Sequence, residues 1–438
     1  MKGFSFLRPC LCWGVLLCLL GPGAGHAQPA AVVPPTFVPS AALDLPALIR
    51  VVLERTASLQ EDHLAVELGQ ADVHQSRLID NPVIDGAVGT IPVGPSNPPD
   101  LVDPLANVPN YSVGISVHPN LARRGVRIDQ SVALLQAADA KRRYAARTQA
   151  LRLLRTLGDL ATATLRMAAD SHLLAQARNA LTVARERVRT GFGPPLDGDR
   201  AEIEQLRIEQ QVAADLGDIL AAKAACAEIL GVRCEAFEGE AAARGFLSTW
   251  LARGETLPLD VSARPDLQAL AAQHAAALAE TRLARRAWVP DPTVRVGYTY
   301  DRFVISGNQQ HSLNVSLSVP LPLLDHGQAA EQAGQARQRR LVLQRQLTLQ
   351  SAQAKVSALL QSMAIARQRL SALQQQVLPR VQAVLRNVGR AFEARAVPLT
   401  DVIQAQRSMD ELLLQEATAL GEVFRLTTDL IEESADHE

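Results

Sequence analysis

The amino-acid sequence predicts an α+β fold made of two internal repeats, each with two strands and two long helices. Three observations predict this fold. The order of an Asx-Pro pair, two strands, a very long helix, a short tip and a second helix starts at Asn81-Pro82 and again at Asp291-Pro292, about 200 to 210 residues later. Alternating apolar and polar residues mark the strands, and long proline-poor runs rich in alanine and leucine mark the helices.

The N-terminus has the features of a secretory signal in the usual order. Lys2 and Arg8 precede and flank the start of an apolar run from Cys10 to Leu20, and Gly25-His26-Ala27 offers small residues for cleavage. We therefore expect residues 1–27 to be removed on export. The apolar run is too short to span a membrane, and no later stretch approaches about 18 uninterrupted apolar residues, so no transmembrane helix is expected.

The remaining chain divides into four parts by composition. Residues 28–43 are rich in proline and alanine and predict an extended lead-in. The first repeat covers 44–245, and its first helix is expected from Leu45 to near Asp80, where Asn81-Pro82 ends it. Residues 246–260 are expected to be a linker, and 261–434 form the second repeat.

Four segments alternate between apolar and polar residues as strands do, at about 83–93, 111–118, 293–302 and 312–319. Each has about the 9 to 11 residues that a tilted strand needs to cross a bilayer. An ordinary antiparallel sheet with one wet face explains the alternation equally well. Four strands cannot close a barrel, however, so other copies of the chain would have to meet the edges. Behind a secretory signal, these segments predict strands in an outer membrane and helices in the periplasm.

A helix of exceptional length follows each pair of strands. The expected helices run from Gly125 to Arg189 and from Gly327 to Ala394, with Pro379 as the only internal proline, and each is about 95 to 100 Å long. The second carries a seam of apolar residues at 3,4 spacing, from Leu349 to Val377. The first carries two adjacent seams and can contact a neighbour on each side, which a curved wall of helices requires. A plain antiparallel coiled-coil hairpin is the alternative.

Both long helices end in a short tip, near residues 191–200 and 395–401. The two tips share the pattern Pro-x-x-Asp-x-x-x-Ala, with Asp197 in the first and Asp401 in the second, at an offset of 204 residues. Proline at a helix start and aspartate in its first turn also favour the helix locally, which explains these residues without any function. Repetition of the whole tip, far from the strands, predicts a functional end.

Composition and motifs exclude several classes of function. Lys and Arg number 44 against 45 Asp and Glu, and aromatic residues are 4%, so nucleic acid is not expected as a partner. The histidines outside the signal show no ligand spacing, and no phosphate loop or nucleophile motif occurs, so no metal site, cofactor or enzymatic activity is predicted. Cys226 and Cys234 are a candidate disulfide in an oxidising compartment, or two buried free thiols.

The chain resembles the TolC-type outer-membrane efflux proteins over about residues 42–434. Within that family it looks closest to the cobalt-zinc-cadmium efflux branch. The stretches that carry the resemblance are 77–82, 289–292 and 317–325, together with the second tip, Pro398-Leu399-Thr400-Asp401-Val402-Ile403-Gln404-Ala405-Gln406.

The resemblance implies a homotrimer in the outer membrane, in which four strands from each chain close one 12-stranded β-barrel. The helices continue it as a long periplasmic α-helical barrel. Such a protein is a passive duct that docks onto a periplasmic adaptor and an inner-membrane pump, of the RND type, to export small molecules or metal ions. The runner-up is a soluble periplasmic coiled-coil adaptor or structural interaction protein.

The resemblance also implies roles for the tip residues. Asp401 falls where acidic side chains ring the entrance of related channels, and Asp197 is its counterpart in the first repeat. Thr400 and Gln404 complete the expected gate, although Gln404 stands where related channels have a second acidic residue. The expected adaptor contacts are Gly191, Pro194, Pro195, Leu196, Pro398 and Leu399.

Overall fold

The structure is a computed structural model that describes residues 36–40, 42–95, 101–255, 260–302, 309–394 and 396–434. All of them belong to one compact unit, Thr36–Glu438. The expected signal peptide and most of the lead-in lie outside the described residues. The end of the lead-in is attached to the fold, because Phe37 N–H donates to Arg233 O at 2.8 Å and Glu235 N–H donates to Phe37 O at 2.9 Å.

The four strands form one antiparallel sheet in the order β1-β2-β3-β4. They are β1 (Val83–Gly89), β2 (Asn110–Val117), β3 (Thr293–Asp301) and β4 (His311–Ser318). The expected length of 9 to 11 residues is too long for three of them, since β1 has 7 residues and β2 and β4 have 8 each. β1 ends early because Thr90 adopts a left-handed backbone with φ of 54°, which stops the extended chain.

The first repeat contributes five helices. They are α1 (Leu45–Arg55), α2 (Ala57–Arg77), the short α3 (Pro104–Asn107), α4 (Arg124–Arg189) and α5 (Leu196–Leu230). The single helix expected from Leu45 to Asp80 is wrong, because the chain breaks at Thr56, whose ψ is 117°. The Thr56 hydroxyl is buried and donates to Ile229 O at 3.1 Å, so the break is fixed by a contact with the end of α5.

α6 (Glu240–Arg253) spans the expected end of the first repeat and the start of the expected linker. The helices described in the second repeat are α7 (Pro265–Arg285), the 3-10 turn η1 (Arg286–Trp288), α8 (Gln328–Ala372), the π turn η2 (Leu373–Val377), α9 (Leu378–Glu393) and α10 (Leu399–Glu433). The linker expected at 246–260 is wrong in its first half, which belongs to α6. The helix is stabilised there because Phe246, Leu247 and Trp250 are fully buried in the main core.

The second long helix is helical without a gap from Gln328 to Glu393, close to the expected bounds, but it contains a π turn. Pro379 cannot donate a backbone hydrogen bond, and its ring collides with the carbonyl one turn earlier in a regular α-helix. The π turn at Leu373–Val377 directly precedes it and places Pro379 in the first turn of α9, where a proline is tolerated. By contrast α4 has no proline and runs for 66 residues, about 99 Å.

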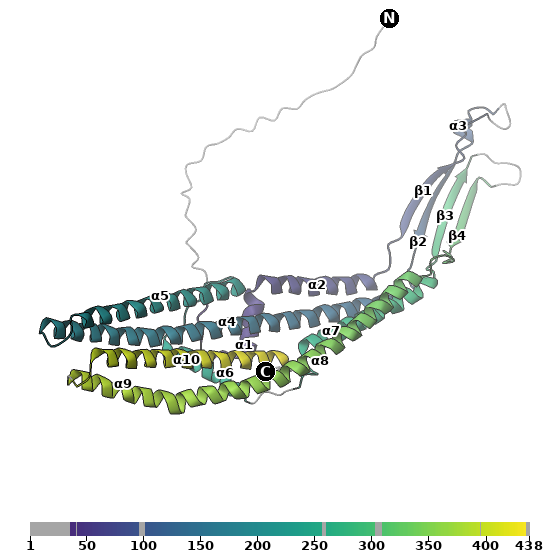
Figure 1. Cartoon of the computed structure of the whole chain (residues 1–438). Coiled ribbons are helices and arrows are strands. Elements are labelled where there is room, and N and C mark those ends of the chain that lie inside the picture. The colour runs from purple at the N-terminus through teal and green to yellow at the C-terminus, as the bar shows by residue number, and fades with distance from the viewer. Residues whose placement is uncertain are drawn as a thin grey trace, which may run out of the picture. The chain divides into compact units, whose positions relative to one another are not determined.

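The helices form two antiparallel pairs that run away from the sheet (Figure 1). α4 lies along α5 and α2, and α10 lies along α8 and α9 and also contacts α4. The main core joins α1, α4, α6 and α10 around Leu154, Leu157 and Phe424. None of the helices in the described part of the chain is long and apolar enough to cross a membrane.

Candidate functional site

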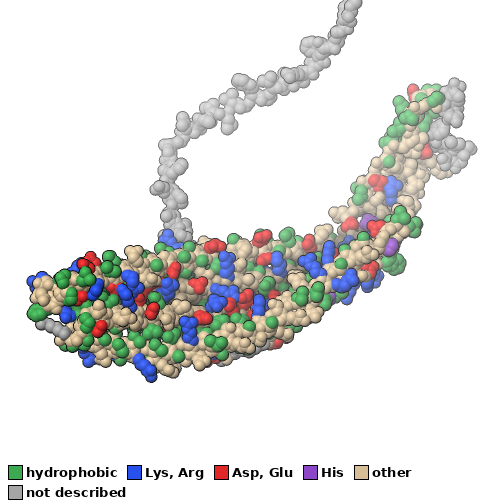
Figure 2. Space-filling model, viewed as in Figure 1, with side chains coloured by type: hydrophobic (Ala, Val, Ile, Leu, Met, Phe, Trp, Pro, Cys, Tyr) green, Lys and Arg blue, Asp and Glu red, His purple; other side chains and the backbone are tan. Residues whose placement is uncertain are grey.

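One face of the sheet is apolar and open to its surroundings. The register places Ile84, Ile115, Val296 and Val315 in one row across the four strands, and Val113, Tyr298 and Leu313 in the next. These side chains are between 42% and 74% exposed. Figure 2 shows few charged side chains over the strands and many over the helices. A contiguous apolar face of this kind marks a surface that contacts a membrane or a partner.

The opposite face of the sheet is polar and carries an ion pair. Arg295 on β3 reaches across β2 to Asp85 on β1, with 2.8 Å between Nε and Oδ2. Ser116 on β2 donates to the other oxygen of Asp85 at 2.9 Å. A Cβ at Gly114 would lie 2.7 Å from the Arg295 guanidinium, so glycine leaves the room that this crossing needs. The pair ties three strands of one chain together on the polar face.

The two tips lie at the same end of the helices, opposite the sheet (Figure 1). They are held together by an apolar cluster of Leu181, Ala184, Ala201, Phe392, Leu399 and Val402. Arg187 covers this cluster, with its guanidinium carbon 4.4 Å from the centre of the Phe392 ring. The tips of the two repeats are therefore one packed unit.

The expected gate residues lie at the starts of α5 and α10. Asp401, Thr400 and Gln404 are exposed on α10. Asp197 is half-buried in the first turn of α5, and its Oδ1 lies 3.8 Å from Nη1 of Arg200. Neither aspartate is the N-cap of its helix, since Pro195 and Pro398 hold the N-cap positions and have no side-chain capping hydrogen bond.

The expected adaptor-contact residues divide into exposed and buried ones. Gly191, Pro194, Pro195, Leu196 and Pro398 are exposed, and Leu196 remains 55% accessible. Gly191 has a φ of +74°, a left-handed backbone that favours glycine at this turn. Leu399 is only 1% exposed and packs inside the tip cluster, so it supports the tip from within rather than forming its surface.

Cys226 and Cys234 are joined by a disulfide at the end of α5. Both sulfur-bearing residues are buried, and Cys234 pairs with Phe37 through a parallel β-bridge. The bond therefore fixes the turn after α5 to the end of the lead-in.

A set of buried charges between the repeats was missed in the sequence. Glu204 on α5 is 2% exposed and binds Arg207 on its own helix and Arg407 on α10, at 3.0 and 2.7 Å. Burial alone would raise the pKa of Glu204, but hydrogen bonds from the two guanidinium groups lower it. Asp170 on α4, Asp215 on α5 and Asp410 on α10 are also buried. For Asp215 a signal was present in the sequence, because this residue interrupts the apolar 3,4 series Ile208, Val212, Ile219 and Ala222.

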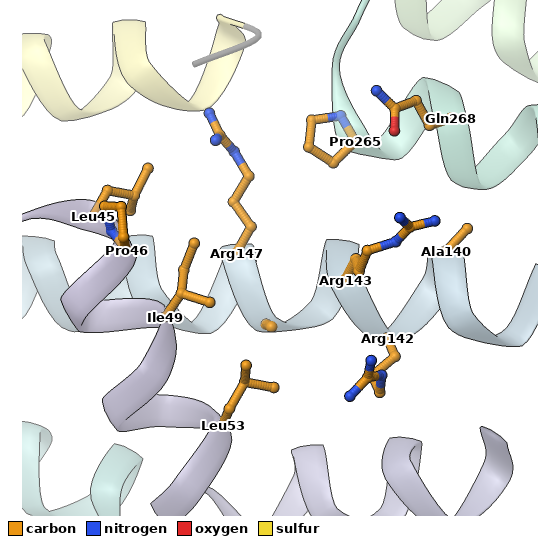
Figure 3. A pocket seen from close by; sticks show the side chains of 11 residues that line it. Leu45, Pro46, Ile49, Leu53, Ala140, Arg142, Arg143, Arg147, Pro265 and Gln268 are labelled. Atoms are coloured by element: carbon orange, nitrogen blue, oxygen red, sulfur yellow. The ribbon is translucent and has the colours of Figure 1, made fainter. Parts of the chain in front are cut away.

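A pocket of about 270 Å³ lies between α1, α4 and the start of α7 (Figure 3). Its apolar wall comes from α1, and its polar rim contains Arg142, Arg143 and Arg147. Arg147 points to the end of α10 and donates to Ile431 O at 2.7 Å and Ser434 O at 3.2 Å. Among the described residues, no group of three or more His, Cys, Asp or Glu side chains is arranged to hold a metal ion. Arg147 thus connects the rim of the pocket to the end of α10.

Comparisons with known proteins give one family, one curated relative and several solved structures. The model of the family described as "Outer membrane efflux protein" matches residues 261–430. The cobalt-zinc-cadmium resistance protein CzcC of Cupriavidus metallidurans is 27% identical over 265 residues, which are 58% of this chain and 59% of that protein. The match thus spans about three fifths of the relative.

The fold is similar to that of solved outer-membrane channels over most of the chain. The CusC structure has a TM-score of 0.70 at 16% identity and covers 93% of this chain and 98% of its own. VceC from Vibrio cholerae has a TM-score of 0.67 at 16% identity and covers 89% and 96%. The channel OprN has a TM-score of 0.66 at 18% identity and covers 89% of both chains.

Proposed function

We propose, from the premise that this chain is an outer-membrane protein related to the TolC-type efflux proteins, that it is the duct of a three-part export system. Three copies would close one 12-stranded barrel from their four-stranded sheets and continue it as a helical tunnel. The tips would dock onto a periplasmic adaptor and an inner-membrane pump of the RND type, which supplies the energy. The cargo would be small molecules or metal ions.

The apolar face of the sheet is the observation that carries this proposal. A row such as Ile84, Ile115, Val296 and Val315 would be unstable in water but favourable against lipid chains. The polar face, with Asp85 and Arg295, would line a water-filled interior. β1 and β4 each have one unpaired edge in the single chain, and β1 of one copy can pair with β4 of the next. A symmetric ring leaves no edge open.

Charge at the tip gives the proposed entrance its chemistry. Asp401 is exposed at the start of α10, and three symmetry copies of its carboxylate near the axis would repel one another and attract cations. Gln404, one turn later, is neutral, so the ring would be single rather than double. Asp197 contributes less, because it is half-buried beside Arg200.

Single-channel conductance tests the role of Asp401. We expect divalent cations to reduce the conductance of the native protein, and Asp401→Ala to remove most of this block. Asp199→Ala is the matched control, since Asp199 is also exposed in the first turn of a tip helix and has no ion pair in the described chain. An equal block in the native protein and in Asp401→Ala would exclude Asp401 from the entrance.

Fractionation tests the proposal as a whole. We expect the mature chain in the outer-membrane fraction, extractable only with detergent, and running on gels as a trimer that dissociates on heating. A soluble monomer in the periplasm would instead support the coiled-coil adaptor or structural protein. The CzcC relative, by its name, acts in cobalt, zinc and cadmium resistance, so these cations are the first cargo to test with the adaptor and pump present.

A further inference from the structure

Three aspartates meet between helices from the two repeats. Asp170 lies on α4, Asp215 on α5 and Asp410 on α10, and their exposed fractions are 0%, 0% and 6%. The carboxyls of Asp215 and Asp410 are the charged neighbours of the Asp170 carboxyl, whose two oxygens are buried without a hydrogen-bond partner. We call these residues the three-aspartate cluster. α4 and α5 form the hairpin of the first repeat and α10 belongs to the second, so the cluster joins the two hairpins.

Two of the three carboxylates have a cation and the third has none. Nη2 of Arg166 lies 3.0 Å from Oδ1 of Asp215, and Nη2 of Arg207 lies 2.8 Å from Oδ2 of Asp410. Asp170 has no ion pair in the described chain, and its charged neighbours are the other two aspartates. Both of its oxygens are buried without a hydrogen bond from any N–H group or hydroxyl.

The two arginines are also shared with other carboxylates. Arg166 binds Asp218 at 3.1 Å, and Arg207 binds Glu204 at 3.0 Å. The three buried aspartates therefore face two partly exposed guanidinium groups that are shared with other carboxylates, and an excess of buried negative charge is costly unless it is neutralised. The carboxyl groups are not arranged as a metal site in the described residues. A proton is the remaining counter-charge.

A proton on Asp170 gives its buried carboxyl a hydrogen-bond donor. The protonated carboxyl has one O–H group, which donates to a carboxylate oxygen of Asp215 or Asp410. Burial first, and then the two neighbouring carboxylates, raise the pKa of Asp170 to about 8. The proton is therefore bound at neutral pH and is released in mildly alkaline solution.

We propose that the three-aspartate cluster is a proton-operated contact between the two hairpins. With the proton bound, the O–H of Asp170 donates one hydrogen bond from α4 to a carboxylate on α5 or α10, and one of the three negative charges is removed. Without it, three buried carboxylates face one another and α10 is pushed from the α4–α5 hairpin. The proposal rests on the proposed function only in one respect, namely that separation of the hairpins near the tips widens the entrance.

Other contacts keep the hairpins together when the proton leaves. Glu204 remains bound to Arg207 and Arg407, and hydrogen bonds with these groups lower its pKa, so it stays ionised and paired across the same pH range. Leu173, Ala177 and Ile208 of the α4–α5 hairpin form an apolar cluster, and Leu413 of α10 packs against it. Proton loss is therefore expected to loosen this level of the bundle and not to unfold it.

Infrared spectroscopy of the native trimer tests whether the proton is there. A protonated carboxylic acid has a carbonyl stretch that a carboxylate lacks, and this band is expected at pH 7 and lost at pH 9. About nine tenths of Asp170 carries the proton at pH 7 and about one tenth at pH 9, for a pKa of about 8. Asp170→Asn should lack the band at both values, whereas Asp199→Asn should keep it at pH 7. A native spectrum without the band would overturn the proposal.

Spin labels test the movement. Ala214 and Glu411 are exposed and adjacent to Asp215 and Asp410, so nitroxides at these positions report the separation of α5 and α10. We expect the mean distance to increase from pH 7 to pH 9 in the native background and in Asp199→Asn. Asp170→Asn, which is neutral at every pH, should keep the shorter distance. An increase in Asp170→Asn equal to that of the native protein would assign the movement to another group and reject the proposal.

These two readouts do not depend on channel activity. A protein that forms no channel in planar bilayers but shows the infrared band and the label movement would refute the proposed function and retain the inference. A protein that forms conducting channels but lacks the infrared band or the label movement would retain the proposed function and refute the inference.

Discussion

Gly158 on α4 lies at the closest approach of two helices in the main core. A Cβ built there would be 2.1 Å from Cε1 and 2.5 Å from Cδ1 of Phe424 on α10. Phe424 cannot move aside easily, because it is 2% exposed and its ring centre lies 5.7 Å from that of Phe246, which is fully buried. We therefore expect Gly158→Ala to separate α4 from α10.

The magnitude follows from two opposing effects. Alanine in place of glycine inside a helix stabilises it by about 1 kcal/mol. Overpacking a core by a methyl group destabilises it by about 1–3 kcal/mol, and the short distances at Gly158 place it at the upper end. Gly217 on α5 isolates the first effect, since nothing lies within 4 Å of a Cβ built there. The difference in unfolding free energy between Gly158→Ala and Gly217→Ala is then about 3 kcal/mol.

Chemical denaturation in detergent, followed by the circular dichroism of the helices, measures this difference. Gly217→Ala should match or exceed the native midpoint, and Gly158→Ala should fall below it. Adding Phe424→Leu to Gly158→Ala should cost less than the sum of the single changes, because the clash is removed, with a coupling of about 0.5–3 kcal/mol. Equal stability of the two alanine variants would refute the close contact.

Two further predictions concern the disulfide and a buried ion pair. Replacing Cys226 and Cys234 by serine should reduce the unfolding free energy by about 2–3 kcal/mol, as for a short closed loop. A reductant should lower the denaturation midpoint of the native protein to that of the serine variant. An unchanged midpoint in the variant and in the reduced protein would contradict this prediction. Burial alone would raise the pKa of Glu416, but hydrogen bonds from Arg244 and Gln374 lower it. The Arg244–Glu416 ion pair therefore stabilises the fold above the ordinary glutamate pKa, and this contribution is lost as the pH falls. Arg244→Ala should therefore cost about 1.5–3 kcal/mol at pH 7 and less at pH 4, whereas Arg152→Ala, which breaks an exposed pair with Glu228, should cost under about 1 kcal/mol at both.

The predicted resemblance to the outer-membrane efflux proteins and the predicted outer-membrane location are confirmed. Alternation in the strands was sufficient to predict which residues share a face, because the side-chain period in a strand is two and tolerates no shift. The apolar residues of 111–118 and 293–302 therefore fall on one face of the sheet, as expected. The ends of the strands were less predictable, since they depend on backbone turns such as that at Thr90.

Helix breaks were predicted poorly where a tertiary contact decides them. Nothing local at Thr56 stops a helix, but its hydroxyl finds a carbonyl acceptor 173 residues away on Ile229. Residues 246–260 have a mixed composition that suggests a linker, yet Phe246 and Trp250 find room in the core and hold α6 in place. Pro379 was visible in the sequence, but the π turn that accommodates it was not.

At the tips, the sequence pattern predicted where the helices restart but not how each residue packs. The repeated Pro-x-x-Asp pattern locates both tips and the first turns that contain Asp197 and Asp401. The pattern treats the two aspartates as equivalent, whereas the structure half-buries Asp197 beside Arg200 and leaves Asp401 exposed. The leucines at the two helix starts also differ, since Leu196 is exposed and Leu399 is buried in the tip cluster. Arg200 of the same repeat lies beside Asp197, whereas Leu181 and Ala201 of the first repeat help to bury Leu399.

Duplication therefore explains the order of the elements but not how the two copies hold together. Two identical hairpins could pack together through apolar seams alone, and most of the contact between the hairpins is of this kind. At one level, however, carboxyl groups occupy the seams: Asp215 on α5 and Asp410 on α10, opposite Asp170 on α4. Apolar residues there would pack without a counter-charge and would be at least as stable. A buried set of this kind makes the contact between the hairpins depend on a proton, which an apolar seam cannot do. This is the physical reason to look for control of the duct between the repeats as well as at its tip.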